Sequence, residues 1–285
     1  IPIGNIIGGA VHDFTAGMMS LRHDGANLPA LIRMTTGKTF YFIFSLFMIF
    51  LLLLVVAVFI NIPARLIDGF WPSDALFWTA VLCIFLYYIA ATLFPVDKII
   101  GSVYPLFGAM LILGTLAIFG VLMYEAIGNP ALLEESAAFK AAMFTPENNM
   151  PILPMLFVTI ACGILSGFHA TQSPIIARTM KHEKQARSSF YGMMVVEGVI
   201  GMIWAAAGLA IYNLFPQMMA DNPTNVLSEI TKYFLGSWVG AVTVISVIIL
   251  AITSGDTAMR SLRLSLAEMF HIDQKHILNR VLLCL

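Results

Sequence analysis

Long apolar runs alternate with short polar segments over most of this chain. The runs at residues 40–60 and 101–123 each hold more than 20 residues without a charged side chain, and about 20 helical residues cross the ~30 Å hydrocarbon layer of a bilayer. We therefore expect an all-α, polytopic transmembrane helical bundle that forms a single transmembrane domain over residues 1–285. Expected spans lie near residues 40–60, 76–94, 101–123, 152–170, 190–214 and 237–254, and a glycine-interrupted segment at 1–19 brings the total to about seven membrane segments.

The composition supports a membrane protein and argues against several other classes. Hydrophobic residues make up 59% of the chain and charged residues 11%, against about 45–50% and about 25% in soluble domains. The net charge is −1 and the basic residues are scattered over short loops, so we expect no nucleic-acid partner. The sequence has no phosphate-binding loop, dinucleotide fingerprint, paired zinc-ligand spacing or nucleophile elbow. We therefore expect no cofactor and no enzyme activity, and any concentrating transport would draw on an ion gradient.

The loops differ in charge from one side of the expected bundle to the other. If loops alternate between the two sides, twelve of the fifteen Lys and Arg residues fall on one side and only Arg65, Lys140 and Lys232 on the other. Cytoplasmic loops of membrane proteins carry the excess of positive charge. We therefore expect the basic side to be cytoplasmic and the side with the Pro- and Asn-rich connections to be exterior.

The first segment, residues 1–19, carries polar groups where lipid would exclude them. Its glycines disfavour a continuous helix, so we expect a broken or re-entrant element. Charged groups at bilayer depth cost roughly 2.5–3.5 kcal/mol each on insertion scales, which makes His12 and Asp13 candidate proton-coupling residues. Adjacent residues point roughly 100° apart on a helix, so we expect these two side chains not to pair with each other.

A second polar cluster lies at the end of the expected span 152–170. Hydroxyl, imidazole and carboxamide groups provide the donors and acceptors that a small polar solute needs. Pro174 should disfavour helix at Ser173 and leave the preceding carbonyls free for a ligand, although a polar helix end at the cytoplasmic edge would explain the same residues. The candidate substrate-binding residues are Ser166, His169, Thr171, Gln172 and Ser173.

Two carboxylates complete the set of candidate proton-coupling residues. Glu197 lies about a turn and a half into its span, where it needs protonation or a partner, and it could serve either in coupling or as a structural hydrogen-bonding group. Asp256 can form an i,i+4 ion pair with Arg260, or act in gating or coupling. Basic residues at intervals of three from Arg178 to Arg187 predict a basic stripe on an amphipathic turn, either a topological anchor or an anion-attracting vestibule.

Four strings of this sequence together resemble the carbon starvation protein A family. They are Gly-Ala-Val-His-Asp-Phe from Gly9, Ser-Gly-Phe-His-Ala-Thr-Gln-Ser-Pro from Ser166, Phe-Tyr-Gly-Met-Met-Val-Val-Glu-Gly from Phe190, and Thr-Ser-Gly-Asp-Thr-Ala from Thr253. The resemblance implies a multi-pass protein of a bacterial or archaeal inner membrane that takes up peptides or, with protons, pyruvate under carbon starvation. It also implies kinship with the inverted-repeat fold of amino acid, polyamine and organocation transporters.

The hypothesis is a secondary transporter whose first-segment His12 and Asp13 converge with the His169 to Ser173 cluster on one cavity. Its expected partners are a small-molecule substrate (a peptide or small carboxylate), a proton or other coupling ion, and the lipid bilayer. One alternative is a membrane-embedded metal-dependent enzyme that uses His12, Asp13 and His169 as ligands; another is a nutrient sensor. The sequence leaves the actual substrate, the coupling ion and the oligomeric state open. The chain begins with Ile1 and ends in a further apolar stretch, so we expect it to be truncated at both ends.

Overall fold

The computed structural model describes residues 4–93, 97–134, 167–216 and 226–284, and these residues form helices and connections without a sheet. Expected span 152–170 falls mostly on residues 135–166, outside the described part. The π-helices are η1 (Gly4–Gly9) and η4 (Arg187–Gly192), and the 3-10 helices are η2 (Pro130–Leu133) and η3 (Glu183–Gln185). The α-helices are α1 (Ala10–Arg22), α2 (Leu28–Thr36), α3 (Lys38–Asp68), α4 (Asp74–Leu93), α5 (Asp97–Gly128), α8 (Gly167–Thr179), α9 (Met193–Leu214), α11 (Val226–Met269) and α12 (Ile277–Leu282).

Among the described residues, five helices are long and apolar enough to cross a membrane. They are Lys38–Asp68, Asp74–Ala91, Tyr104–Gly128, Glu183–Leu214 and Val226–Met269. Each contains most or all of one expected span, so an all-helical membrane bundle is confirmed at this level. Segment 1–19 is not among the five; its described part is π-helix η1 running directly into α1.

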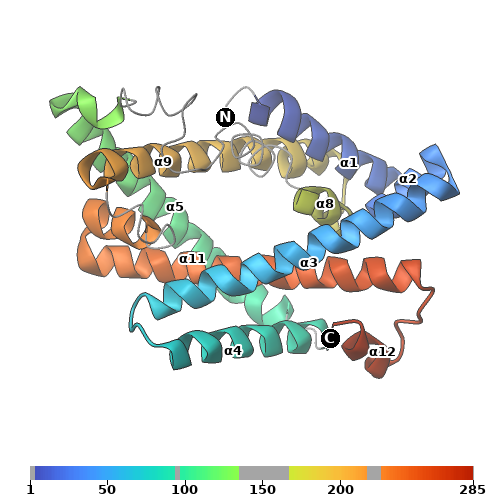
Figure 1. Cartoon of the computed structure of the whole chain (residues 1–285). Coiled ribbons are helices and arrows are strands. Elements are labelled where there is room, and N and C mark those ends of the chain that lie inside the picture. The colour runs from blue at the N-terminus through green and yellow to red at the C-terminus, as the bar shows by residue number, and fades with distance from the viewer. Residues whose placement is uncertain (1–3, 94–96, 135–166, 217–225, 285) are drawn as a thin grey trace, which may run out of the picture.

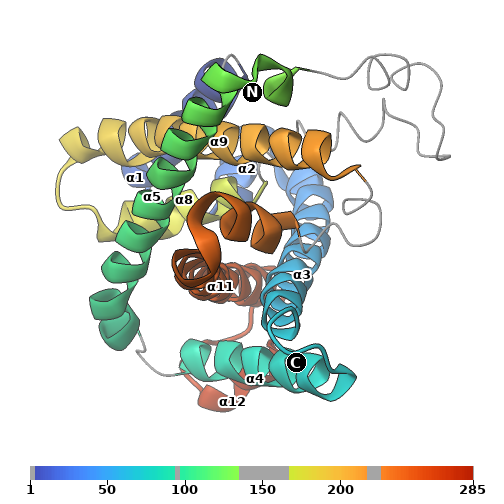
Figure 2. The same cartoon turned by 90° about the vertical axis from the view of Figure 1, so that its left-hand side faces the viewer.

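Helix α11 lies at the centre of the arrangement. Figure 2 shows it nearly end-on, with α3, α4, α5 and α9 around it, and it packs mainly against α3 and α5. One buried cluster joins α3, α4 and α11 through Leu52, Tyr88 and Ala258. A second joins α5 and α9 through Ile118 and Ala207. Many large apolar side chains on the outside are exposed, as a surface that faces lipid tails requires.

A glycine allows α11 to pass close to α4. Tyr88 of α4 is fully buried and donates a hydrogen bond to the carbonyl of Phe59 at 3.0 Å. Its hydroxyl lies so near Gly255 of α11 that a Cβ there would overlap it. Residue 255 must therefore lack a side chain for α4 and α11 to approach in this way.

Helix α11 is broken near its start. Gly236 has φ 74° and ψ 176°, which interrupts the helix between its first ten residues and the long remainder. The positive φ is a region that glycine enters without the cost that a Cβ imposes. Figure 1 shows the short first part of α11 folded back beside the long part, at the left of the view. The apolar window at 237–254 predicted the long part, but not the break or the segment before it.

Candidate functional site

Asp13 of α1 contacts the imidazole rings of two histidines. Its Oδ1 lies 3.1 Å from Nδ1 of His12, and its Oδ2 lies 3.0 Å from Nδ1 of His169 on α8. The expectation that His12 and Asp13 do not pair is wrong, because their side chains bend toward each other although their Cα–Cβ directions diverge. Helices α1 and α8 pack closely along their length, and the Asp13–His169 hydrogen bond is part of that contact.

His169 also meets a second carboxylate. Its Nε2 lies 3.4 Å from Oε2 of Glu197 on α9. We call His12, Asp13, His169 and Glu197 the histidine–carboxylate cluster. Side-chain exposure is 10% for Asp13 and 18% for His169, against 62% for Glu197. The Asp13–His169 pair is therefore largely shielded, while Glu197 forms the open end of the cluster.

The cluster geometry requires an exchangeable proton. A carboxylate accepts hydrogen bonds, so both Nδ1 atoms that face Asp13 must carry a hydrogen. In a neutral imidazole the other ring nitrogen is then an acceptor, and Nε2 of His169 would face an accepting oxygen of Glu197. The contact is attractive only when a proton sits on Nε2 or on Glu197. The His169–Glu197 pair is thus chemically suited to bind and release one proton.

The cluster opens on a pocket of about 370 Å³ between α1, α8, η4, α9 and the start of α5. Four residues of α8 line the pocket: His169, Gln172, Ser173 and Ile176. The last three lie three, four and seven residues after His169, so all four share one face of the helix. We call this the His169 pocket. It is lined by Asp13, Tyr104, His169, Gln172, Ser173, Ile176, Ser189, Phe190, Met193, Met194 and Glu197.

The other predicted site residues lie elsewhere. Thr171 is buried on a different face of α8, beside Ser261 and Ser265 of α11. Asp256 on α11 does not line the His169 pocket, and its Oδ2 lies 3.6 Å from Arg260, which confirms the expected i,i+4 ion pair. Ser166 falls outside the described residues.

Helix α8 continues through Ser173 and Pro174, so the expectation that Pro174 disfavours helix at Ser173 is wrong. The helix runs from Gly167 to Thr179 with Pro174 inside it. Proline removes one backbone donor and leaves the carbonyl four residues earlier without its usual partner. The hydroxyl of Ser173 donates to the carbonyl of His169 at 2.9 Å. This bond helps hold the turn that carries the imidazole.

Packing against glycines brings α1 and α9 together at the pocket. A Cβ on Gly17 of α1 would overlap the ring of Phe190 in η4, and a Cβ on Gly198 of α9 would lie 2.5 Å from the Asn5 side chain in η1. Asn5 and Phe190 are both buried. The π-helical turns η1 and η4 therefore lie at the contact of these two segments, and such turns are frequent at functional sites.

Several pocket residues were missed from the sequence, although a pattern could have found some. Ser189, Met193 and Glu197 repeat at intervals of four, which places them on one face of the helix that carries Glu197. Tyr104 comes from α5, and no local pattern connects it to the others. Its place depends on how α5 packs, which a single sequence does not specify.

Polar contacts tie together the end of the molecule that we expect to be cytoplasmic. Arg178 of α8 donates to the carbonyl of Gly25 and to the side chain of Asn27, both at 2.9 Å. Asn27 in turn donates to Glu268 of α11 at 3.2 Å. Nε and Nη2 of Arg22 both donate to Oε1 of Glu183, at 3.1 and 2.8 Å.

The expected stripe of basic residues on one turn is wrong, because α8 ends at Thr179 and residues 180–187 follow a different path.

The described residues contain no group of three or more His, Cys, Asp or Glu side chains placed to hold a metal ion. The alternative of a metal-dependent enzyme that uses His12, Asp13 and His169 gains no support from this part of the chain. The arrangement that these residues do form is a row of hydrogen-bonded acids and imidazoles beside a pocket. That row places hydrogen-bond donors and acceptors along the pocket wall.

Known proteins are similar to this chain over most of its length. A protein of Haemophilus influenzae described as an uncharacterized membrane protein is 38% identical over 267 residues, which cover 78% of this chain and 71% of that protein. The pyruvate/proton symporter BtsT of Escherichia coli is 24% identical over 73% of this chain and 37% of the symporter. The peptide transporter CstA of Helicobacter pylori is 26% identical over 71% of this chain and 38% of that transporter. No solved structure matches the chain significantly.

The matched parts cover less than two fifths of each of these two named transporters but more than two thirds of this chain. The sequence profile of the family described as carbon starvation protein CstA matches residues 1–80 and 70–233. These ranges include the whole histidine–carboxylate cluster. The chain therefore belongs to the carbon starvation protein CstA family.

Proposed function

We propose that this chain forms the solute- and proton-binding part of a secondary transporter for small nutrients, either peptides or pyruvate-like carboxylates. The observation that carries the proposal is His169, which lies between Asp13 and Glu197 at 3.0 and 3.4 Å on the wall of the His169 pocket. Relatives named as a pyruvate/proton symporter and as peptide transporters support the class of solute and the role of protons. A bacterial plasma membrane is the location that fits those relatives.

Proton binding would act through the charge of the pocket wall. With both carboxylates ionised and both imidazoles neutral, the histidine–carboxylate cluster carries two negative charges. Closing such a pocket from water is costly, and one proton shared by His169 and Glu197 halves the charge. Solute polar groups would meet Gln172, Ser173 and Ser189 on the same wall. Protonation and solute binding would then favour the same closed state, which is the requirement for symport.

The broader architecture is part of the proposal. We infer about seven membrane segments in one domain and a fold related to the inverted-repeat transporters, in which broken helices surround a midplane site. The break of α11 at Gly236 and the π-turn before α1 are the irregular elements that such a fold would use.

Uptake in proteoliposomes tests the proposal. We would reconstitute the protein, impose an inward proton gradient, and measure entry of labelled pyruvate and of labelled alanyl-alanine. Asp13→Asn and His169→Gln should each lower gradient-driven uptake more than about tenfold, about 1.4 kcal/mol in the barrier. His182→Gln is the matched control, because His182 is exposed and does not line the pocket. Full uptake by both site variants would refute the assignment of the pocket.

Glu197→Gln separates coupling from solute binding. An amide cannot release a proton to His169, so gradient-driven accumulation should be lost. Exchange of internal for external solute, which needs no net proton movement, should be retained. Equal loss of accumulation and of exchange would instead mark Glu197 as a structural residue and would contradict its coupling role.

A further inference from the structure

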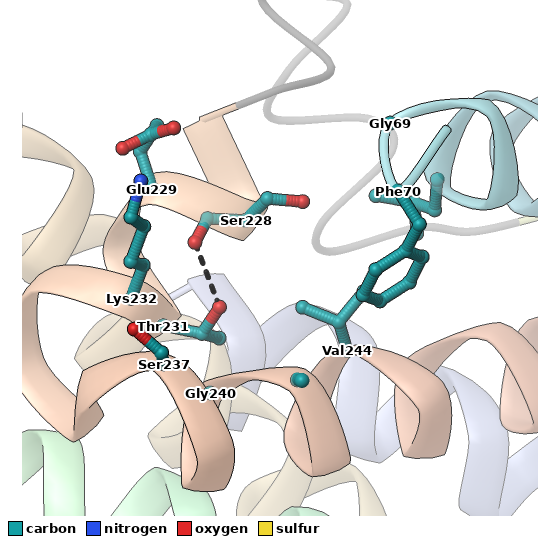
Figure 3. A pocket seen from close by; sticks show the side chains of 11 residues that line it. Gly69, Phe70, Ser228, Glu229, Thr231, Lys232, Ser237, Gly240 and Val244 are labelled. Atoms are coloured by element: carbon teal, nitrogen blue, oxygen red, sulfur yellow. Dashed lines mark hydrogen bonds between the residues drawn. The ribbon is translucent and has the colours of Figure 1, made fainter. Parts of the chain in front are cut away.

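A second pocket lies at the break of α11. It has a volume of about 210 Å³ and lies between the end of α3 and the residues on both sides of Gly236. Figure 3 shows Phe70 on one side of this space and Ser228, Thr231 and Ser237 on the other. We call it the Gly236 pocket. Its lining residues are Leu66, Gly69, Phe70, Ser228, Glu229, Thr231, Lys232, Ser237, Gly240, Ala241 and Val244.

The pocket exists because the two parts of α11 approach closely. A Cβ on Gly240 would lie 2.8 Å from the carbonyl oxygen of Thr231, so only glycine permits this approach. Thr231 is buried and donates to the carbonyl of Ser228 at 2.9 Å. The polar wall is thus built from the helix break itself, while the opposite wall comes from the end of α3.

The Gly236 pocket is distinct from the His169 pocket. It shares none of its lining residues with the His169 pocket, and its residues come from the end of α3 and the start of α11. By the charge asymmetry of the loops this is the exterior end of the bundle. The His169 pocket, in contrast, takes residues from the start of α9, where that helix leaves the cytoplasmic side.

One acidic and one basic side chain line the Gly236 pocket. Glu229 is half-buried and Lys232 is exposed, and they lie three residues apart on the short first part of α11. Neither forms an ion pair with another described residue. A solute with only a carboxylate would gain from Lys232 but be repelled by Glu229. A solute with both a carboxylate and an ammonium group satisfies both side chains at once.

We propose that the Gly236 pocket binds a small zwitterion, an amino acid or dipeptide, on the exterior side of the protein. Lys232 would meet the carboxylate, Glu229 the ammonium group, and Phe70, Leu66 and Val244 the apolar part. The volume is below the about 300–1,000 Å³ of pockets for drug-sized ligands, which suits a solute of this size. This site goes beyond the proposed transport activity, because binding here needs neither His169 nor a proton gradient.

Equilibrium binding to the purified protein tests the site. The probe is labelled alanyl-alanine, measured with the unmodified protein and with the His169→Gln variant, and both should bind it. Glu229→Gln and Lys232→Gln should each weaken binding about tenfold or more, because each replaces a hydrogen bond between two charged groups by a weaker one from a neutral amide. The double variant Glu229→Lys with Lys232→Glu should recover part of the affinity. Asp74→Asn, an exposed carboxylate outside the pocket, is the matched control and should change nothing.

Competition identifies the chemical class. In the His169→Gln variant, which isolates the Gly236 pocket, unlabelled alanine or alanyl-alanine should displace the probe, whereas N-acetyl-alanyl-alanine, alanyl-alanine amide and pyruvate should not. Equal competition by pyruvate, unchanged affinity in both pocket variants, or no binding by the His169→Gln variant would each overturn the proposal. So would the absence of detectable probe binding by the unmodified protein. Retained probe binding together with full uptake by Asp13→Asn and His169→Gln, or with no uptake by the unmodified protein, would refute only the transport mechanism, so the two proposals fail separately.

Discussion

Asp13 and His169 are 156 residues apart in the sequence and are joined by a hydrogen bond of 3.0 Å. The bond links α1 to α8, and Glu197 extends it to α9 through its contact with the other ring nitrogen. Three helices thus share one row of titratable groups. Movement of any one of them relative to the others would alter the hydrogen bonding along the whole row.

The two imidazoles of the cluster should differ in importance. Within the described part of the chain, the His12 imidazole pairs with one carboxylate, Asp13, and its side chain is 38% exposed, whereas His169 bridges two carboxylates and is 18% exposed. We expect His169→Gln to lower gradient-driven uptake more than about tenfold and His12→Gln to lower it only several-fold. The measurement is initial uptake rate in proteoliposomes at equal protein content. Equal losses would show that His12 is a full member of the proton path.

Gly17→Ala should destabilise the protein through its contact with Phe190. The added methyl group would overlap the buried ring, and overpacking of this kind costs about 1–3 kcal/mol. The thermal melting temperature of the protein in detergent should fall. In the Phe190→Leu background, the same substitution should cost less, because the ring has been removed. Gly120→Ala, in α5 with nothing within 4 Å of its Cβ position, is the control and should not lower the melting temperature.

Gly255 and Tyr88, like Gly17 and Phe190, should have interdependent effects on stability because they are in close contact. Gly255→Ala should lower the melting temperature, because its methyl group would overlap the Tyr88 hydroxyl. Tyr88→Phe alone should cost about 1 kcal/mol, the value of the hydrogen bond to Phe59. The double variant should be more stable than the sum of the two losses predicts. Strict additivity would show that the two residues do not interact.

Arg178 should stabilise the turn between α1 and α2. Its guanidinium reaches the Gly25 carbonyl and the Asn27 side chain at the same time, which a lysine cannot do. We expect Arg178→Lys to lower stability by about 1 kcal/mol and to increase proteolysis between α1 and α2. Lys181→Gln removes a nearby exposed charge and serves as control. Unchanged proteolysis in Arg178→Lys would contradict this role.

The membrane character of the fold could be predicted from the sequence, but the helix ends could not. Lipid-spanning runs are set by local hydropathy, and five expected spans coincide with described helices. Helix α3 continues to Asp68 through Asn61 and Pro63, and α11 begins before its break with Glu229 and Lys232. Polar residues and Pro63 lower the local hydropathy at these positions, so the apolar run stops there although the helix continues. A hydropathy pattern therefore marks the centre of a span and misses its extensions.

The candidate site was predictable only in part for a similar reason. His12, Asp13, His169 and Glu197 stood out because titratable groups are rare in apolar segments. Their mutual distances depend on how α1, α8 and α9 pack, and this is a non-local property. Thr171 and Ser173 look alike in sequence, yet one faces α11 and the other lines the His169 pocket. The Gly236 pocket gave no local signal except a glycine just before the expected span 237–254.

The break at Gly236 separates the long part of α11 from the short part before it, so the long part can tilt as one rigid helix. Residues 237–269 form a rod of roughly 50 Å at 1.5 Å per residue, so a tilt of about 5° at one end moves the other by about 4 Å. That far end carries Glu268, which holds Asn27, and Asn27 is bound by Arg178 of α8, the helix that also presents His169. A small rotation at one face of the molecule would therefore reach the opposite face as a displacement of about 4 Å, longer than a hydrogen bond.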